Sequence, residues 1–182
     1  MKVALVSLNQ SWEDKEANRL KVRNCFQTIA FRNMDLVIFP EMTLTGFTMN
    51  VKEHAEEAEN SATIRFFTDC ACQYGVYIGF GMILKAGIKA ANHFIIVSPE
   101  GEMCADYIKI HPFSYAGEDR FYEKGKHLTS LEIQGVPIGL SICYDLRFPE
   151  IFQALSRTDK LILNIANWPE RRVLHWKTLI QA

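Results

Sequence analysis

Short apolar runs alternate with segments of helical periodicity along this chain, and that order constrains its fold more than any other feature. Residues 36–39 are continuously apolar and end at Pro40, as in a short strand that is buried on both faces. An amphipathic helical face is indicated upstream by Val22, Cys25, Phe26, Ile29 and Ala30. Strands that alternate with helices predict a layered α/β fold rather than a stack of sheets alone.

The other elements follow from the same periodicities. Strands are expected at residues 2–8, 36–39, 76–84, 93–98, 105–110, Val136–Ile142 and Leu161–Ile165. One helix is expected to start at Ser11, with Asp14 three residues on, and another to be capped by Ser61. Two more are expected at residues 148–156 and 173–182. No repeat or linker interrupts the pattern, so residues 1–182 are expected to form a single domain.

The composition argues against several classes of partner. The chain has 182 residues, of which 48% are hydrophobic and 23% charged, and its net charge is −1. These values are near the globular average and leave no basic field for nucleic acid or an anionic membrane. The apolar runs are strand-sized, and the first residues lack the long apolar region of a signal peptide.

Cysteine and histidine usage predicts a cytoplasmic protein without a metal or other cofactor. The five cysteines form an odd set without framework-like spacing: Cys25, Cys70, Cys72, Cys104 and Cys143. Such a set favours a reducing compartment. A single residue separates the closest pair, unlike a zinc knuckle, and the five histidines are scattered singly.

Glu41 directly follows the apolar run at residues 36–39 and Pro40. A carboxylate in this position sits at the carboxyl edge of the sheet, where the ligand crevices of open α/β sheets lie. Taken alone, a single glutamate more often forms an ordinary salt bridge or caps a loop, and this alternative stays open.

Lys109 stands between Ile108 and Ile110, so its ammonium emerges from an apolar strand. A lysine placed there needs a carboxylate partner, and desolvation makes its pKa tunable. The alternative is a lysine on an edge strand that protects against aggregation.

Cys143 ends the strand Val136–Ile142, and the polar cluster Tyr144-Asp145-Leu146-Arg147 follows at once. A thiolate at such a turn can be stabilised by backbone N–H groups and by the start of the following helix. The backbone N–H of Tyr144 is placed to donate to an oxyanion. The alternative is a buried structural cysteine.

Together these three residues predict one chemistry. A thiol nucleophile needs a base, and a carboxylate can serve if a nearby cation poises it. A lysine ammonium then stabilises a tetrahedral oxyanion together with the backbone N–H that follows the thiol. Glu41, Lys109 and Cys143 therefore predict acyl transfer through a thioester, with no metal and no histidine required.

Three ordered motifs resemble those of the carbon–nitrogen hydrolase, or nitrilase, superfamily over residues 2–182: Phe-Pro-Glu (39–41), Tyr-Ile-Lys-Ile-His (107–111) and Ser-Ile-Cys-Tyr-Asp-Leu-Arg-Phe-Pro-Glu (141–150). The resemblance implies that Glu41 is the general base, Lys109 the oxyanion-stabilising lysine and Cys143 the nucleophile. Glu118 matches the second glutamate of the family, which helps to position the lysine and the substrate. Without the resemblance, Glu118 would be interpreted as a solvated loop acid.

The resemblance also implies an α-β-β-α sandwich that usually dimerises through its outer helices. Family members are longer than this chain, and its last helical pattern stops at Ala182 without a C-cap signal. We therefore expect the C-terminal part of the family domain to be missing.

Further segments, Asn-Ile-Ala-Asn-Trp-Pro (164–169) and Leu-His-Trp (174–176) among them, resemble the ω-amidase branch most. Its members hydrolyse monoamides of dicarboxylic acids, such as α-ketoglutaramate and succinamate, and release ammonia. Such a substrate needs a cation for its distal carboxylate, and the planar fork of Arg147 suits that task. Alternatively, Arg147 holds the turn through Asp145 or Glu150.

Three aromatic residues are expected to wall the substrate pocket: Trp168, Phe47 and Phe113. Two alternatives to the ω-amidase interpretation stay open. One is another branch with the same triad, namely a nitrilase, an N-carbamoyl amide hydrolase or a deaminated glutathione amidase. The other is a non-catalytic protein that retains the fold.

Overall fold

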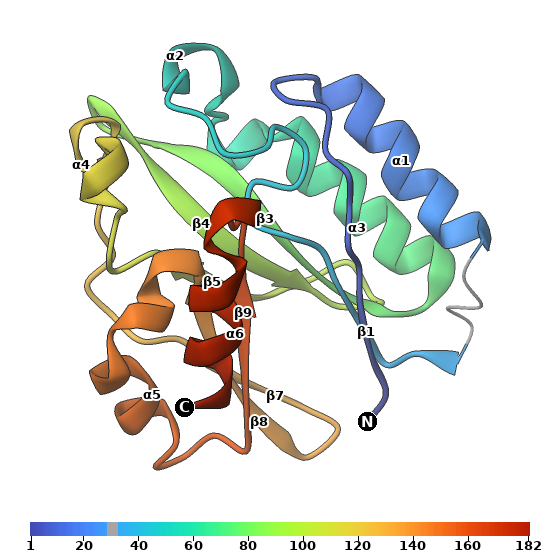
Figure 1. Cartoon of the computed structure of the whole chain (residues 1–182). Coiled ribbons are helices and arrows are strands. Elements are labelled where there is room, and N and C mark those ends of the chain that lie inside the picture. Colours follow the sequence, from blue (N-terminus) through green and yellow to red (C-terminus); the bar gives the residue numbers. More distant parts are fainter. Residues whose placement is uncertain (29–32) are drawn as a thin grey trace.

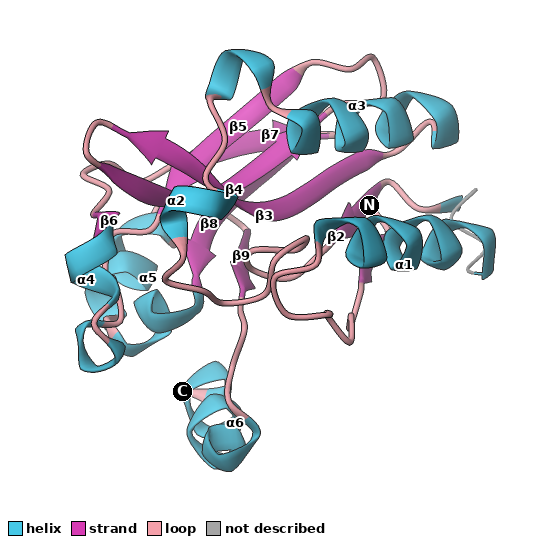
Figure 2. Ribbon diagram, turned by 90° about the horizontal axis from the view of Figure 1, so that it is seen from above, coloured by secondary structure: helices cyan, strands magenta, loops and turns pink. Residues whose placement is uncertain are grey.

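The structure is a computed structural model that describes residues 1–28 and 33–182. The described strands form two sheets, and helices lie on the outer faces of both (Figures 1 and 2). The layers run helix, sheet, sheet, helix. This order confirms the α-β-β-α sandwich expected from the sequence.

The larger sheet has its strands in sequence order, with a short sixth strand beside the fourth. These strands are β1 (Val3–Leu5), β2 (Leu36–Ile38), β3 (Tyr77–Ala86), β4 (Lys89–Val97), β5 (Met103–Ile108) and β6 (Tyr122–Glu123). The first three are parallel, whereas β3, β4 and β5 form antiparallel pairs. Parallel neighbours need a crossover, and α1 (Lys15–Thr28) and α3 (Ala62–Tyr74) provide the two crossovers.

Both crossover helices cover the outer face of the larger sheet, side by side (Figure 1). Phe26 of α1 stacks on Tyr74 of α3 with ring centroids 4.5 Å apart. Phe67 of α3 in turn stacks on Phe80 of β3 at 4.1 Å. This aromatic layer anchors the helices, since each large ring removes much apolar area from water.

The smaller sheet contains β7 (Ser130–Ile133), β8 (Val136–Ile142) and β9 (Leu161–Ile165). Its inner face meets the larger sheet in a core formed by Leu36, Ile38, Phe94, Ile96, Ile138, Leu140, Ile142 and Leu163, among others. α5 (Pro149–Leu155) packs on its outer face at Gly139, where an added Cβ would lie 3.0 Å from the Leu155 side chain. The chain then leaves β9 and forms α6 (Val173–Gln181).

Helix ends confirm part of the sequence prediction. Ser61 caps α3, because its hydroxyl accepts the N–H of Ile64 at 3.0 Å. The first helix begins later than expected: Asp14, rather than Ser11, accepts the N–H of Ala17 at 2.9 Å. Ser11 instead donates its backbone N–H to Asn18. The expected apolar face of this helix includes Ile29 and Ala30, which lie outside the described residues.

Several strand boundaries differ from the prediction. β1 covers only part of residues 2–8, and β4 starts at Lys89 rather than at residue 93. The start of β4 has low strand propensity, and its conformation is set by antiparallel pairing with β3. β7 was not predicted; Gln134 and Gly135, with φ of 51° and 75°, form the tight turn that pairs it with β8.

Two short helices, α2 (Val51–His54) and α4 (Glu118–Phe121), complete the described α-helices. β5 ends at Ile108, so Lys109 lies just beyond the strand and not within it. Across residues 1–28 and 33–182, no helix combines the length and apolar character needed to span a membrane.

Candidate active site

Glu41 lies in the segment that follows β2, and its side chain is fully buried. This segment passes very close to β3, because an added Cβ on Gly81 would lie 2.6 Å from the Glu41 Cα. A glycine at position 81 therefore permits the approach of the two backbones. The result is a carboxylate held in the interior at the end of the parallel strands.

Lys109 reaches the same interior point from the end of β5. Its Nζ lies 3.0 Å from Oε1 of Glu41 and 2.9 Å from Oε2 of Glu118, and its side chain is 1% exposed. Glu118, from α4, is also fully buried and accepts the backbone N–H of Phe113. The alternatives of an edge lysine at 109 and a solvated loop acid at 118 are therefore wrong.

One ammonium is shared between two buried carboxylates. Burial by itself would lower the pKa of Lys109, but the adjacent carboxylates, Glu41 above all and then Glu118, outweigh it and raise that pKa. Lys109 therefore stays charged. Burial raises the pKa of Glu118, and the charge of Glu41 adds to this effect while Lys109 opposes it.

Two asparagines that sequence reasoning missed complete the cluster. Asn92 of β4 donates its Nδ2 to Oε1 of Glu41 at 2.8 Å and to Oε1 of Glu118 at 3.2 Å. Asn167 donates its backbone N–H to Oε2 of Glu41 at 2.8 Å and its Nδ2 to the Glu41 carbonyl. Both oxygens of the Glu41 carboxylate are therefore oriented by hydrogen bonds. Asn167 belongs to the motif at residues 164–169, but nothing in the sequence around Asn92 indicated a functional role beyond its place before an expected strand.

Cys143 follows β8 with a left-handed φ of 47° and is 8% exposed. Non-glycine residues adopt this conformation rarely, and it is enriched at functional turns. The next element is a short 3-10 helix, Cys143–Arg147, and α5 begins only at Pro149. No α-helix therefore starts at the thiol.

The expected stabilisation of the Cys143 thiolate is wrong for the structure as it stands. Burial raises the pKa of Cys143 well above its ordinary value, and the negative charge of Glu41 raises it further, while Lys109 opposes both. The thiol is therefore neutral near pH 7 and has an internal carboxylate at hand.

Asp145 ties the thiol turn to the chain segment that carries Lys109. Its buried carboxylate accepts the hydroxyl of Tyr107 at 2.7 Å and the backbone N–H of Ile142 at 3.0 Å. It also accepts the backbone N–H of His111 at 2.9 Å. The ring of His111 stacks on Phe148, with centroids 3.6 Å apart.

A cavity of about 60 Å³ opens onto this cluster. Its lining residues are Phe47, Lys109, Phe113, Cys143, Tyr144, Arg147, Asn167, Trp168, Pro169 and Arg172. The structure thus brings all four residues predicted to contact substrate into one cavity with the thiol and the lysine. Glu41 and Glu118 are not among the lining residues; both carboxylates pair with Lys109, and Glu41 also interacts with the Cys143 thiol.

Arg147 does not hold the turn through Asp145, whose oxygens are occupied by the contacts described above. Its guanidinium contacts Nδ1 of His175 at 3.0 Å. It also lies 5.4 Å from the ring centroid of Trp168 and 5.9 Å from that of Tyr144. The side chain is therefore directed along the aromatic wall of the cavity.

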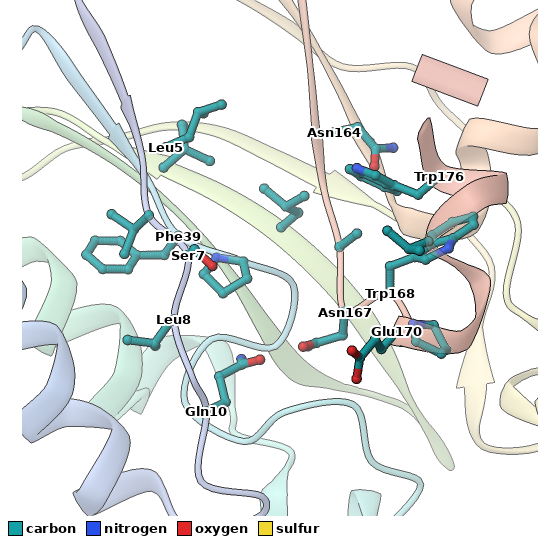
Figure 3. A pocket seen from close by; sticks show the side chains of 17 residues that line it. Leu5, Ser7, Leu8, Gln10, Phe39, Asn164, Asn167, Trp168, Glu170 and Trp176 are labelled. Carbon is teal, nitrogen blue, oxygen red and sulfur yellow. The ribbon is translucent and has the colours of Figure 1, made fainter. Parts of the chain in front are cut away.

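A second, larger cavity of about 430 Å³ lies beside the first, between β1 and the β9–α6 segment (Figure 3). The two share Asn167, Trp168 and Pro169. Figure 3 shows Gln10 on one side and Trp168 with Trp176 on the other. The larger cavity contains neither the thiol nor the lysine, so the chemistry described above belongs to the smaller one.

Glu41→Gln is expected to lower the pKa of Cys143 and speed its alkylation by iodoacetamide at pH 7. The substitution removes a negative charge that raises the thiol pKa and leaves the opposing charge of Lys109 in place. Each unit by which the pKa falls multiplies the thiolate fraction about tenfold. Labelling rates are measured by mass spectrometry of the peptides, with the exposed Cys72 as internal reference.

Glu57→Gln is the matched control, since Glu57 is an exposed partner of Lys85 and does not belong to the lining of the small cavity. This variant should label Cys143 at the wild-type rate. Slower labelling of Cys143 in Glu41→Gln would contradict the prediction and would mean that Glu41 acts on the thiol more as a base than through its charge.

Comparison with known proteins agrees with this architecture. Residues 2–182 match the model of the carbon–nitrogen hydrolase family. The chain is 34% identical to the ω-amidase YafV of Yersinia enterocolitica over 182 residues, which is 100% of this chain and 69% of that protein. It is 30% identical to a 2-oxoglutaramate amidase of Bacillus subtilis, over 92% of this chain and 66% of the relative.

A solved structure has the same fold. A CN-hydrolase superfamily protein from Xanthomonas campestris superposes with a TM-score of 0.89 at 29% identity, over 98% of this chain and 69% of that one. With the family match over residues 2–182, these similarities show that the chain belongs to the carbon–nitrogen hydrolase family.

No metal centre emerges from the described part of the chain: it contains no group of three His, Cys, Asp or Glu side chains placed to hold an ion. The acidic pair is instead neutralised in part by Lys109.

Proposed function

We propose that this chain is an ω-amidase. It hydrolyses the terminal amide of small dicarboxylic acid monoamides, such as α-ketoglutaramate and succinamate, and releases ammonia. The observation that carries the proposal is the single cavity lined by Cys143, Lys109 and Arg147, with Glu41 paired to the lysine. The names of the ω-amidase and 2-oxoglutaramate amidase relatives support the same substrate class.

The first half-reaction forms a thioester. Glu41 takes the proton of the Cys143 thiol as the sulfur attacks the amide carbon, because the neutral thiol is a weak nucleophile. The carbonyl π electrons move to oxygen, where the Lys109 ammonium and the Tyr144 backbone N–H stabilise the oxyanion. As the intermediate collapses, the C–N bond breaks and the nitrogen leaves as ammonia with the proton from Glu41.

The second half-reaction releases the acid. Glu41 takes a proton from a water molecule as its oxygen attacks the thioester carbon, and the same oxyanion contacts stabilise the new intermediate. Collapse breaks the C–S bond, and the sulfur regains a proton from Glu41. The net reaction consumes one amide and one water and yields one carboxylic acid and one ammonia.

Glu118 and Asn92 act on this reaction through their neighbours. Glu118 fixes the Lys109 ammonium with both carboxylate oxygens, at 3.1 and 2.9 Å from Nζ. Asn92 links Glu118 to Glu41 and so fixes the orientation of the base. Fixed donors and acceptors of this kind need no reorganisation as charge develops in the transition state.

Arg147 binds the distal carboxylate of the substrate, and Phe47, Phe113 and Trp168 contact its short carbon chain. An arginine fork matches carboxylate geometry and forms strong charge-assisted hydrogen bonds. The aromatic walls exclude water, which strengthens this pairing.

A deaminated glutathione amidase is the second candidate, since that branch carries the same triad. The cavity volume favours the smaller substrate. At about 60 Å³ the cavity is far below the roughly 300–1,000 Å³ of pockets that hold drug-sized ligands, so a small monoamide needs less additional space than a tripeptide-sized substrate.

The test is ammonia release from a panel: α-ketoglutaramate, succinamate, glutamine, an aliphatic amide, a nitrile, an N-carbamoyl acid and deaminated glutathione. Turnover is expected to be far faster with the two monoamides than with the others. Turnover of deaminated glutathione in preference to both monoamides would replace the proposal with the second candidate. Silence toward every compound would favour the non-catalytic alternative.

We also propose, from the family resemblance and the composition, that the functional unit is a cytoplasmic homodimer made of one domain per chain. Its partners are the amide and water, without a cofactor, nucleic acid or membrane.

A further inference from the structure

A second guanidinium, that of Arg172, lines the small cavity. Arg172 ends the 3-10 turn Glu170–Arg172, directly before α6, whereas Arg147 ends the turn that starts at Cys143. Both belong to the same lining as Cys143 and Lys109. Both side chains are only partly exposed.

The position of Arg172 is fixed from two sides. Its guanidinium carbon lies 5.1 Å from the ring centroid of Phe113 and 5.4 Å from that of Tyr115, within the range of cation–π contacts. Its backbone carbonyl accepts the indole N–H of Trp168 at 2.8 Å. Trp168 and Phe113, expected as pocket walls, thus also hold this arginine in place.

The three cations that line the cavity differ in their partners. Lys109 is paired with the carboxylates of Glu41 and Glu118. Within the described ranges, neither Arg147 nor Arg172 lies within ion-pair distance of a carboxylate. A half-buried cation without a carboxylate partner favours an anionic ligand.

We propose that Arg172 is a specificity-determining residue that binds the distal carboxylate of the substrate jointly with Arg147. The inference rests on the proposed function and deepens it. A carboxylate offers about four lone-pair sites, so it can accept hydrogen bonds from two guanidinium groups at once. Because Lys109 already has two carboxylate partners and the arginines have none, the substrate carboxylate pairs with the arginines, which leaves the neutral amide for the thiol.

The test compares two substrates that differ only at the far end. Succinamate carries a carboxylate there, and succinamide carries a neutral amide. Arg172→Gln should lower kcat/KM for succinamate about 10- to 100-fold, the range for losing a hydrogen bond to a charged group, mainly through KM. Its kcat/KM for succinamide should change less than about twofold, which also reports that the variant is folded.

Two further variants sharpen the result. Arg171→Gln removes the same charge from the exposed neighbouring residue and should behave as wild type with both substrates. Arg172→Lys keeps the charge but loses the planar fork, so it should fall between wild type and Arg172→Gln. Equal losses on both substrates would overturn the proposal in favour of a structural role, and so would an unchanged rate on succinamate.

A binding measurement separates this inference from the proposed function. Succinate is titrated calorimetrically into Cys143→Ser, with and without Arg172→Gln. One outcome is that succinate binds more weakly to the double variant while the wild-type protein hydrolyses neither monoamide. This outcome would support the anion site at Arg172 and overturn the ω-amidase proposal. Monoamide turnover with equal succinate affinity in both variants would sustain the proposed function and overturn the role of Arg172.

Discussion

Cys143→Ala is expected to abolish ammonia release from every substrate of the protein. The variant lacks the atom that forms the thioester, and no other described cysteine lines the cavity. Loss of a covalent nucleophile typically lowers kcat by about 10⁴-fold or more. Steady-state ammonia assays with the best substrate measure the loss.

The control is Cys104→Ser, at an exposed position on β5. It should retain full activity, which would show that removal of the Cys143 thiol in particular, and not of any thiol, abolishes turnover. Cys143→Ala removes only a sulfur from a largely buried site and should unfold near the wild-type temperature. A folded Cys143→Ala protein with substantial turnover would disprove the thioester mechanism.

Lys109→Met is expected to destabilise the fold as well as to abolish turnover. Methionine fills similar space but leaves Glu41 and Glu118 buried without their shared cation. Breaking a buried ion pair by removing one partner costs about 3–5 kcal/mol of unfolding free energy. Urea denaturation followed by tryptophan fluorescence measures it.

Lys85→Met provides the contrast, because Lys85 pairs with Glu57 at the surface, where both side chains are about half exposed. Exposed pairs contribute little to stability. The urea midpoint of this variant should therefore stay near that of wild type. Equal midpoints for the two methionine variants would mean that the Lys109 cluster is far better solvated than its burial implies.

The reactive residues could be predicted because each lies beside a short apolar run. Glu41 and Cys143 follow runs that end abruptly, and Lys109 interrupts one. Glu41 and Lys109 follow strands of the larger sheet, whereas Cys143 follows β8 of the smaller one, so the packing of the two sheets, and not one sheet edge, brings the thiol to the other two residues. The resemblance to the family then supplied roles that single residues do not reveal.

Other parts of the site were beyond the sequence because tertiary contacts determine them. Asn92 follows two alanines in a segment of low strand propensity, and only its pairing with β3 places the amide between two carboxylates. Arg172 depends on a turn after β9 and on the ring of Phe113. The neutral state of Cys143 depends on burial, which a motif does not report.

The start of the first helix and the strand β7 were not predicted correctly, for related reasons. Ser11 and Asp14 are both good capping residues, and local sequence does not decide which one starts the helix. In the structure the Asn18 side chain forms hydrogen bonds with both the backbone N–H and the carbonyl of Ser11, and the Asp14 carboxylate caps the helix by accepting the N–H of Ala17. β7 is only four residues long, and the turn that follows it fixes its pairing.

The three residues that donate hydrogen bonds to the Asp145 carboxylate come from both halves of the sandwich. Tyr107 and His111 flank the end of β5 in one sheet, and Ile142 ends β8 in the other. A single carboxylate thus links the two sheets by hydrogen bonds, and this link holds Cys143 at a fixed position relative to Lys109. If heat or a mutation in the distant core shifts one sheet relative to the other, hydrolysis should be lost before the secondary structure unfolds.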